Sequence, residues 1–344
     1  MKTAVVICPG RGTYGKAELG SLAQYFKDAG LLAQFDARRA ALGQETLTAL
    51  DEASAYSVAK HTRGDNASAL IYAATIADFA ALQGVEVLAV TGNSMGWYSA
   101  LVCAGALTAQ NGFVVVNTMG TLMQQHLIGG QLIHPFVDEG WHRDPARKAA
   151  LLALAAEIDA RAGHSLALSI NLGGMLVLAG NEAGLAAFEA AVPVAQARFP
   201  MRLANHAAFH TGLQAPVAAL GRGALPATMF AQPKYPLIDG RGAVWWPHAT
   251  DTNALWDYTL GHQVTAPYDF THVITIAARE FAPDLYIITG PGTTLGGAVA
   301  QSLILANWRG LMSKSDFQAA QHAEPFLISM GMDDQRRLVT GETP

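Results

Sequence analysis

A serine between two glycines, in the run Gly92-Asn93-Ser94-Met95-Gly96, most constrains what this chain can fold into. The stretch 85–90 before it is apolar and rich in β-branched residues, which is typical of a buried parallel strand. The stretch 97–104 after it is apolar, lacks proline and is typical of a helix. Strand, tight turn and helix in this order predict a nucleophile elbow, in which the serine stands above the sheet edge between glycines that let strand and helix pack closely. The pentapeptide also fits a turn without chemistry, because the pattern occurs by chance.

Composition and charge exclude several other classes of protein. A chain of 344 residues with 51% hydrophobic and 14% charged residues predicts a compact enzyme and not a disordered protein. The net charge of −5, without a long basic run, gives no electrostatic footprint for nucleic acid. No apolar run reaches the roughly 18 residues that a membrane helix needs, so we expect no membrane partner. Two cysteines, Cys8 and Cys103, suggest neither a metal cluster nor a disulfide framework, and a reducing cytoplasm is the expected compartment.

Helix and strand patterns alternate along the chain, as a mostly parallel α/β sheet requires. The apolar spacing predicts a first strand over 3–8, and helices over 16–29 and 67–82, before the elbow strand. After Gly129-Gly130 the composition changes, and a helix, two short strands and a helix capped by Asn181 predict a small α+β insert. The predicted division has a discontinuous α/β core, 1–130 and 203–310, the insert 131–202, and a C-terminal extension 311–344.

A serine nucleophile needs a base, and the chain has eleven histidines, the side chains that most often take this role. His206 and His210 lie among small residues where the insert rejoins the core. His210 would take the serine proton and later return it to a leaving thiol, as general acid–base catalysis requires.

Four blocks in order then resemble the malonyl-CoA:acyl carrier protein transacylase family, which includes the acyltransferase domains of fatty acid and polyketide synthesis. The motifs that the family has in this order are P-G-Q-G, G-H-S-L-G-E-Y-S-A-L, H-A-F-H-S and a closing G-P-G. Their counterparts here are Pro9-Gly10-Arg11-Gly12, GNSMGWYSAL from Gly92, HAAFHT from His206, and GPGTTLGG from Gly290. A fifth, weaker block is His262-Gln263-Val264-Thr265-Ala266-Pro267, and together the blocks span residues 9 to 297.

The resemblance implies a role for each matching position. Ser94 would be the acylated nucleophile, His210 its general base, and the main-chain carbonyl of Gln263 the group that orients the histidine. The main-chain N–H groups of Arg11 and Met95 would form the oxyanion hole. The resemblance also implies a hydrolase-like α/β core that carries a small ferredoxin-like insert, with the active site in the cleft between them.

The function predicted on this basis is an acyl carrier protein S-acyltransferase with a ping-pong mechanism. It would move an acyl group from CoA or a carrier protein to the thiol of an acyl carrier protein, without a permanently bound cofactor or metal. A thioesterase with the same Ser-His pair is the alternative, and a non-catalytic docking partner is a third class. Because carrier proteins are acidic, a basic rim is expected, and the candidates are Arg143, Arg147, Lys148, Arg198 and Arg202.

Three departures from the family bear on the acyl group. Met119 stands where the family has the arginine that pairs with the malonyl carboxylate, and Asn93 and Trp97 replace a histidine and a glutamate beside the serine. A methionine cannot pair with a carboxylate, and an unpaired buried charge costs several kcal/mol. A substrate site with Met119, Asn93 and Trp97 therefore predicts an uncharged acyl group. The side chain of Arg11 is a possible compensating cation, which keeps malonyl open.

Overall fold

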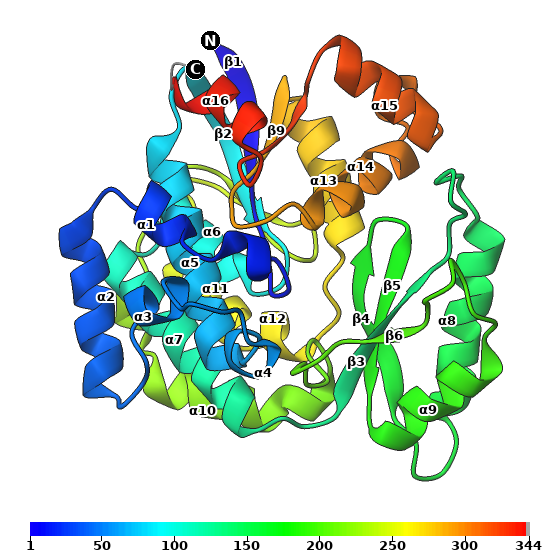
Figure 1. Ribbon diagram of the computed structural model, residues 1–344. Coiled ribbons are helices and arrows are strands. Elements are labelled where there is room, and N and C mark those ends of the chain that lie inside the picture. Colours follow the sequence, from blue (N-terminus) through cyan, green and yellow to red (C-terminus); the bar gives the residue numbers. More distant parts are fainter. Residues whose placement is uncertain (342–344) are drawn as a thin grey trace.

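The computed structural model describes residues 1–341 and contains two β-sheets (Figure 1). Residues 342–344, the end of the predicted extension, lie outside the described residues. The larger sheet has the strand order β10-β9-β1-β2-β7-β8. Its strands are β1 (Lys2–Cys8), β2 (Val85–Gly92), β7 (Leu237–Ile238), β8 (Val244–Trp245), β9 (Leu285–Ile288) and β10 (Leu327–Ser329).

The larger sheet is parallel except at one edge. β1 pairs in parallel with β2 and β9, β10 with β9, and β7 with β2, whereas β8 pairs antiparallel with β7. β1 is fully buried from Ala4 to Cys8, as expected for a central strand covered by helices on both faces. The predicted α/β fold with a mostly parallel sheet is confirmed.

Helices cover both faces of this sheet because the side chains of β1 alternate between them. Val6 and Cys8 belong to a core shared with the first helical layer, which includes α5, α6, α7, α10 and α11. Val5 and Ile7 belong to a second core, shared with α13 and α14. The α-helices of these two layers and of the N-terminal region are α1 (Ser21–Tyr25), α2 (Ala29–Ala41), α3 (Leu47–Asp51), α4 (Val58–His61), α5 (Gly64–Ala81), α6 (Gly96–Cys103), α7 (Ala109–Gln125), α10 (Ala215–Ala224), α11 (Thr252–Leu260), α12 (His262–Thr265), α13 (Phe270–Ile276) and α14 (Leu295–Leu305).

Short helical turns complete the core. Four are 3-10 turns: η1 (Lys16–Glu18), η2 (Gly212–Gln214), η3 (Ala227–Met229) and η5 (Trp308–Gly310). A π-helical segment, η4 (Ala277–Phe281), extends α13.

The prediction of one helix over 16–29 is wrong. The structure has η1, a break at Gly20, the five-residue helix α1 and an extended Phe26 before α2 begins at Ala29. Gly20 has φ 86°, in the left-handed region that ends a helix, and apolar spacing alone does not reveal that angle. By contrast, the helix predicted over 67–82 is present as α5, with different ends.

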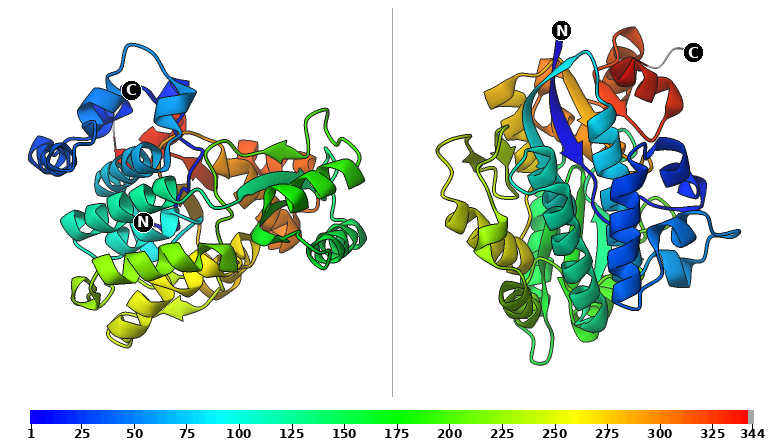
Figure 2. Two further views of the ribbon diagram at one scale, coloured as in Figure 1. Left: turned by 90° about the horizontal axis from the view of Figure 1, so that it is seen from below. Right: turned by 90° about the vertical axis from the view of Figure 1, so that its left-hand side faces the viewer.

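The smaller sheet is antiparallel and has the order β4-β5-β3-β6. It is made by one continuous segment, with two helices between its strands, and forms a lobe beside the larger sheet, coloured green in Figures 1 and 2. Leu132, Leu176 and Leu178 of its strands form a separate core with the two helices. The elements of this lobe are β3 (Gly130–Pro135), α8 (Pro145–Asp159), β4 (Leu166–Leu172), β5 (Met175–Gly180), α9 (Glu182–Ala191) and β6 (Met201–Arg202).

The C-terminal segment contributes α15 (Lys314–Ala323), β10 and α16 (Asp333–Thr340). β10 is hydrogen-bonded to β9, so this part of the predicted extension belongs to the larger sheet. α16 returns to the same side as α5, where Arg336 and Asp78 form an ion pair. Within residues 1–341, every helix is too short or too polar to cross a membrane.

Candidate active site

The turn between β2 and α6 holds Ser94 in a strained conformation. Ser94 has φ 55°, a left-handed angle that costs a non-glycine residue about 1–3 kcal/mol. A Cβ on Gly92 would lie 2.2 Å from the carbonyl carbon of Gly96, and a Cβ on Gly96 would lie 2.1 Å from the carbonyl oxygen of Cys8. Both glycines are therefore required by the close approach of β2, α6 and β1, as the elbow motif predicts.

His210 lies beside Ser94 although 116 residues separate them in the chain. The Ser94 Oγ to His210 Nε2 distance is 2.8 Å, and His210 Nδ1 lies 2.7 Å from the main-chain carbonyl oxygen of Gln263. A carbonyl oxygen only accepts, so Nδ1 carries the proton and Nε2 is left as the acceptor for the serine hydroxyl. The structure thus brings together the three residues that the sequence assigned to the nucleophile, the base and the orienting carbonyl.

Three polar contacts around this trio were not found from the sequence. The side chain of Gln263 donates from Nε2 to the carbonyl of Ser94 at 3.0 Å and accepts from the Tyr98 hydroxyl at 3.1 Å. The Tyr268 hydroxyl donates to the carbonyl of Gly92 at 2.5 Å, and its ring lies 5.5 Å from that of His210. Gln263 and Tyr268 therefore each contact both the elbow and His210 and fix their relative position. The only sequence signal was their place in or just after the weak fifth block.

Burial sets the protonation state of the base. Desolvation lowers the pKa of His210 to about 4, while the hydrogen bond to Gln263 acts in the opposite direction. His210 is therefore neutral at pH 7 and can accept the serine proton.

The rate of Ser94 acylation is expected to keep its neutral-pH value down to about pH 5 and to fall below about pH 4, because only neutral His210 can act as base. Rapid-quench acylation followed by intact mass would give the profile. An inflection near 6.5, the ordinary histidine value, would contradict the lowered pKa. The unfolded chain binds this proton from about pH 6.5 and the folded chain only near 4, so stability falls between these values as the pH drops. Circular dichroism must therefore show that the protein stays folded at each pH.

The loop after β1 lies against the elbow, since the carboxyl ends of neighbouring parallel strands meet at one edge of the sheet. The N–H of Asn93 donates to the carbonyl of Cys8 at 2.9 Å, and a Cβ on Gly10 would lie 2.6 Å from the carbonyl oxygen of Asn93. Arg11 follows in this loop and Met95 follows Ser94, and both line the same cavity as Ser94. Within residues 1–341, neither main-chain N–H donates to another group, so both remain available to an oxyanion.

Two cavities meet at Ser94 and Arg11. The inner one is a narrow space of about 20 Å³ within the core, and the outer one, of about 320 Å³, runs between the core and the smaller sheet. Other residues of the inner cavity are Ser68, Met95, Tyr98, Gly120, Met123, Phe209, His210, Gln263 and Val264. The outer cavity is also lined by Asn93, by His206, by apolar residues of β3 to β6 and by α14.

The predicted substrate residues divide between this site and the core. Asn93 lines the outer cavity. Trp97 is fully buried, donates from Nε1 to the Thr259 hydroxyl at 3.0 Å, and lines neither cavity. Met119 is also fully buried and lines neither, because its sulfur faces α10, where a Cβ on Gly221 would lie 2.6 Å from it. The structure therefore gives the side chains of Trp97 and Met119 packing contacts in the core and no place in the two cavities at Ser94.

Most of the predicted basic rim is tied to other groups. Arg202 pairs with Glu182 and Glu189, Arg143 donates to the carbonyl of Ile304, and Lys148 donates to the Asn171 side chain. Arg147 and Arg198 form no ion pair within residues 1–341. No cluster of three or more metal-ligating side chains occurs in the same part of the chain.

Comparison with known proteins places this geometry in context. No protein-family model matches the chain. A curated malonyl CoA-acyl carrier protein transacylase of Salmonella typhimurium is 27% identical over 211 residues, which are 60% of this chain and 63% of that relative. The match therefore spans less than two thirds of the relative's length.

Solved structures match over nearly the whole chain. The malonyl-CoA:acyl carrier protein transacylase from Synechocystis is 19% identical with a TM-score of 0.72, over 98% of this chain and 100% of that one. A malonyl transacylase solved with a type II polyketide synthase acyl carrier protein gives the same identity and TM-score, over 99% and 100%. The chain has the fold of the malonyl-CoA:acyl carrier protein transacylases. The curated relative supports the same family, which agrees with the order of the sequence blocks.

Proposed function

We propose that this chain is an acyl carrier protein S-acyltransferase that works through an acyl-Ser94 intermediate. The observation that carries the proposal is the relay from Ser94 Oγ through the His210 ring to the carbonyl of Gln263, at the junction of two cavities. The donor would be an acyl-CoA or an acyl carrier protein, and the acceptor a carrier protein. The transacylase name of the curated relative and the solved carrier-protein complex of a similar fold support these partners.

Each half of the reaction uses the same groups. Ser94 Oγ transfers its proton to His210 Nε2 as it attacks the thioester carbonyl carbon. The oxyanion that forms accepts hydrogen bonds from the main-chain N–H groups of Arg11 and Met95. The C–S bond then breaks, and the leaving thiolate takes the proton from His210. In the second half, an incoming pantetheine thiol gives its proton to His210 and its sulfur attacks the carbonyl carbon of the acyl-serine. The bond from that carbon to Ser94 Oγ then breaks, and His210 returns the proton to Oγ, which regenerates Ser94.

The outer cavity suits a pantetheine arm because its lining is largely apolar and comes from both the core and the smaller sheet. The lobe that forms one wall has the order strand, helix, strand, strand, helix, strand, with β4-β5-β3-β6 side by side. This connectivity supports a ferredoxin-like insert, 131–202, on a hydrolase-like core made of 1–130 and 203–310. No permanently bound cofactor is needed for this chemistry, and the proposed compartment is the cytoplasm.

Intact mass spectrometry of the protein with acyl-CoA tests the function directly. We expect one acyl group to be added at Ser94, and to move to a holo acyl carrier protein when that thiol is supplied. Decay of the acyl-enzyme at the same rate without any thiol would instead support the thioesterase alternative. Absence of acylation with every acyl-CoA would contradict both enzyme classes and favour a docking partner.

The prediction of an uncharged acyl group depended on Met119, Asn93 and Trp97, and two of these residues do not line the site. Met119 and Trp97 do not line the cavities at Ser94, so their lack of charge does not set the charge of the site. The cation that does line both cavities is Arg11.

A further inference from the structure

The guanidinium of Arg11 is a cation without an anionic partner at the acyl site. None of the ion pairs within residues 1–341 includes Arg11, and the neighbouring carboxylate, Asp65, pairs with Arg63 at 2.9 Å. Both hydrogen bonds of the Arg11 guanidinium come from Nη2, to the carbonyls of Thr62 and Asn205 at 2.9 and 2.7 Å. Nε is buried and has no acceptor among residues 1–341. Burying a cation without a counter-ion costs free energy of folding, which indicates that this site binds an anion.

The surroundings hold this side chain in place. Its guanidinium lies 5.3 Å from the centre of the Phe209 ring, next to the residue that forms the relay with Ser94. A Cβ on Gly64, at the start of α5, would lie 3.5 Å from Arg11 Nη1 and 2.9 Å from the carbonyl oxygen of Gly120. Close packing of α5 on α7 through two glycines thus leaves room for the guanidinium.

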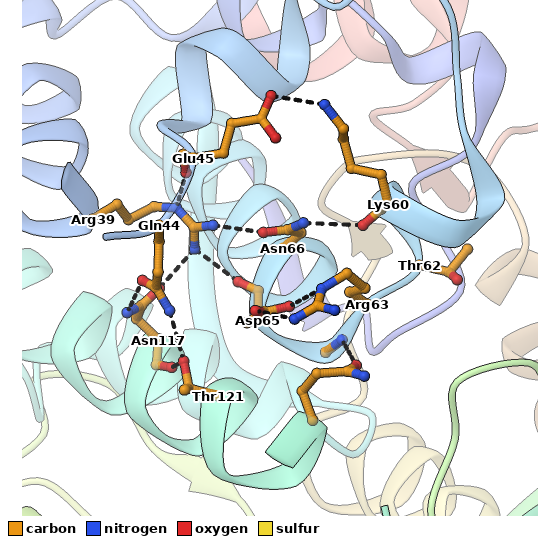
Figure 3. A network of polar contacts seen from close by, with 12 residues as sticks. Arg39, Gln44, Glu45, Lys60, Thr62, Arg63, Asp65, Asn66, Asn117 and Thr121 are labelled. Atoms are coloured by element: carbon orange, nitrogen blue, oxygen red, sulfur yellow. Dashed lines mark hydrogen bonds and ion pairs between the residues drawn. The ribbon is translucent and has the colours of Figure 1, made fainter. Parts of the chain in front are cut away.

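A buried network supports the same helix start (Figure 3). Arg39 is fully buried and donates to the carbonyl of Asp65 and to the side chains of Asn66 and Asn117 at 2.6 to 2.8 Å. The first turn of α5 is thereby fixed to α7, and Thr62, the acceptor for Arg11, lies two residues before α5 begins. The guanidinium is held by a rigid frame and does not need to reorganise to meet an anion.

The residues that line the inner cavity carry no charge that would oppose an anionic group beside Arg11. The residues that line it within 1–341 include no Asp or Glu. Ser68 offers a hydroxyl there without a hydrogen bond to the described residues. His206, on the outer side, does not add a competing charge, because burial lowers its pKa well below the usual range and the charge of Arg11 acts in the same direction. Burial lowers the pKa of Arg11 only to about 10, so the guanidinium stays charged at neutral pH.

We propose that Arg11 determines acyl specificity, by pairing its guanidinium with a carboxylate at the free end of a short dicarboxylic acyl group on Ser94. The proposal rests on the acyl transfer proposed above. It moves the charge recognition from α7, where Met119 packs on α10, to the loop that also supplies an oxyanion N–H. The pantetheine phosphate is an unsuitable partner, because many bonds separate it from the thioester that reaches Ser94. A carboxylate paired with Arg11 replaces the sequence-based expectation of an uncharged acyl group.

The test compares malonyl-CoA with butyryl-CoA, a neutral thioester of similar size, as donors to Ser94. The second-order rate constant for acylation of Ser94 by each donor would be measured for the wild type, R11Q and R11K by rapid quench and intact mass spectrometry. We expect the wild type to prefer malonyl-CoA, and the ratio of malonyl to butyryl acylation to fall by at least about 30-fold in R11Q. R11K should retain part of the preference, since it keeps the charge but loses the planar fork.

A ratio that R11Q leaves unchanged would overturn the role of Arg11. If R11Q does not fold, the donor preference of the wild type is still a test, because a preference for butyryl-CoA over malonyl-CoA would also overturn the proposal. Both outcomes differ from failure of the proposed function, in which neither donor acylates Ser94 in the wild type.

Discussion

Replacing Ser94 by alanine is expected to abolish the acyl-enzyme and to lower acyl transfer by at least about 10⁴-fold. Alanine keeps the fold of the elbow but removes the hydroxyl oxygen that would attack the thioester and that lies 2.8 Å from His210 Nε2. The main-chain N–H groups of Arg11 and Met95 and both cavities remain, so binding of the acyl-CoA should persist while the chemistry stops. Intact mass would show no added acyl group, and transfer to a holo carrier protein would be followed in the same samples.

The matched control is S315A, which changes an exposed serine at the start of α15. This variant should acylate and transfer at the wild-type rate. Acylation of S94A to the wild-type extent would show that another residue is the nucleophile and that the proposed mechanism is wrong.

Replacing Arg336 by methionine is expected to destabilise the folded state by about 3–5 kcal/mol. Arg336 and Asp78 are almost fully buried and form an ion pair that joins α16 to α5, so the variant removes the Arg336 charge that faces this buried carboxylate. Asp78 also accepts from the N–H of Gly290, and Thr75 donates to the carbonyl of the same residue. Thermal and urea unfolding would measure the loss.

The matched control is R337M, because Arg337 is the exposed neighbour on the same helix and forms no ion pair within residues 1–341. Its effect should stay within about 0.5 kcal/mol. Equal losses in the two variants would show that the pair with Asp78 adds nothing specific.

The same contact gives the C-terminal segment a connection to the active site, which sequence analysis did not supply. Gly290 begins the closing G-P-G block, and a Cβ on Gly292 would lie 2.2 Å from the carbonyl oxygen of Thr13 in the loop that holds Arg11. A Cβ on Gly331 would lie 2.3 Å from the carbonyl oxygen of Gly292. The chain from β10 to α16 therefore packs on the turn that contacts the loop with Arg11. A segment without a motif gives no sign of such a long-range contact.

The elbow could be predicted because its geometry is local. Gly92 and Gly96 are needed wherever a strand turns at once into a helix above a parallel sheet, and the steric clash that a Cβ would cause follows from backbone geometry. The pairing of Ser94 with His210 needed the resemblance as well, since nothing local joins residues 116 positions apart. The carbonyl of Gln263 could be assigned on the same basis, but the hydrogen bonds of its side chain could not.

Side-chain direction is where the sequence-based predictions were incomplete. Trp97 and Met119 sit next to residues that line the inner cavity, Tyr98 and Gly120, yet both point into the core. One position on a helix changes direction by about 100°, so which residue faces the substrate depends on how α6 and α7 are rotated against their neighbours. That rotation is set by tertiary packing, including the close contact of Met119 with Gly221.

The alternation of strands and helices and the elbow at Ser94 follow from the sequence, because they depend on apolar spacing and local sterics, whereas the carbonyl of Gln263 beside His210 could be assigned only through the family resemblance. Only the tertiary structure decided what surrounds Ser94. It placed the unpaired cation of Arg11 at the junction of the two cavities and turned the uncharged Met119 away from them. The physical reason is that the cost of a buried charge depends on every group packed around it, and those groups come from parts of the chain that only folding brings together.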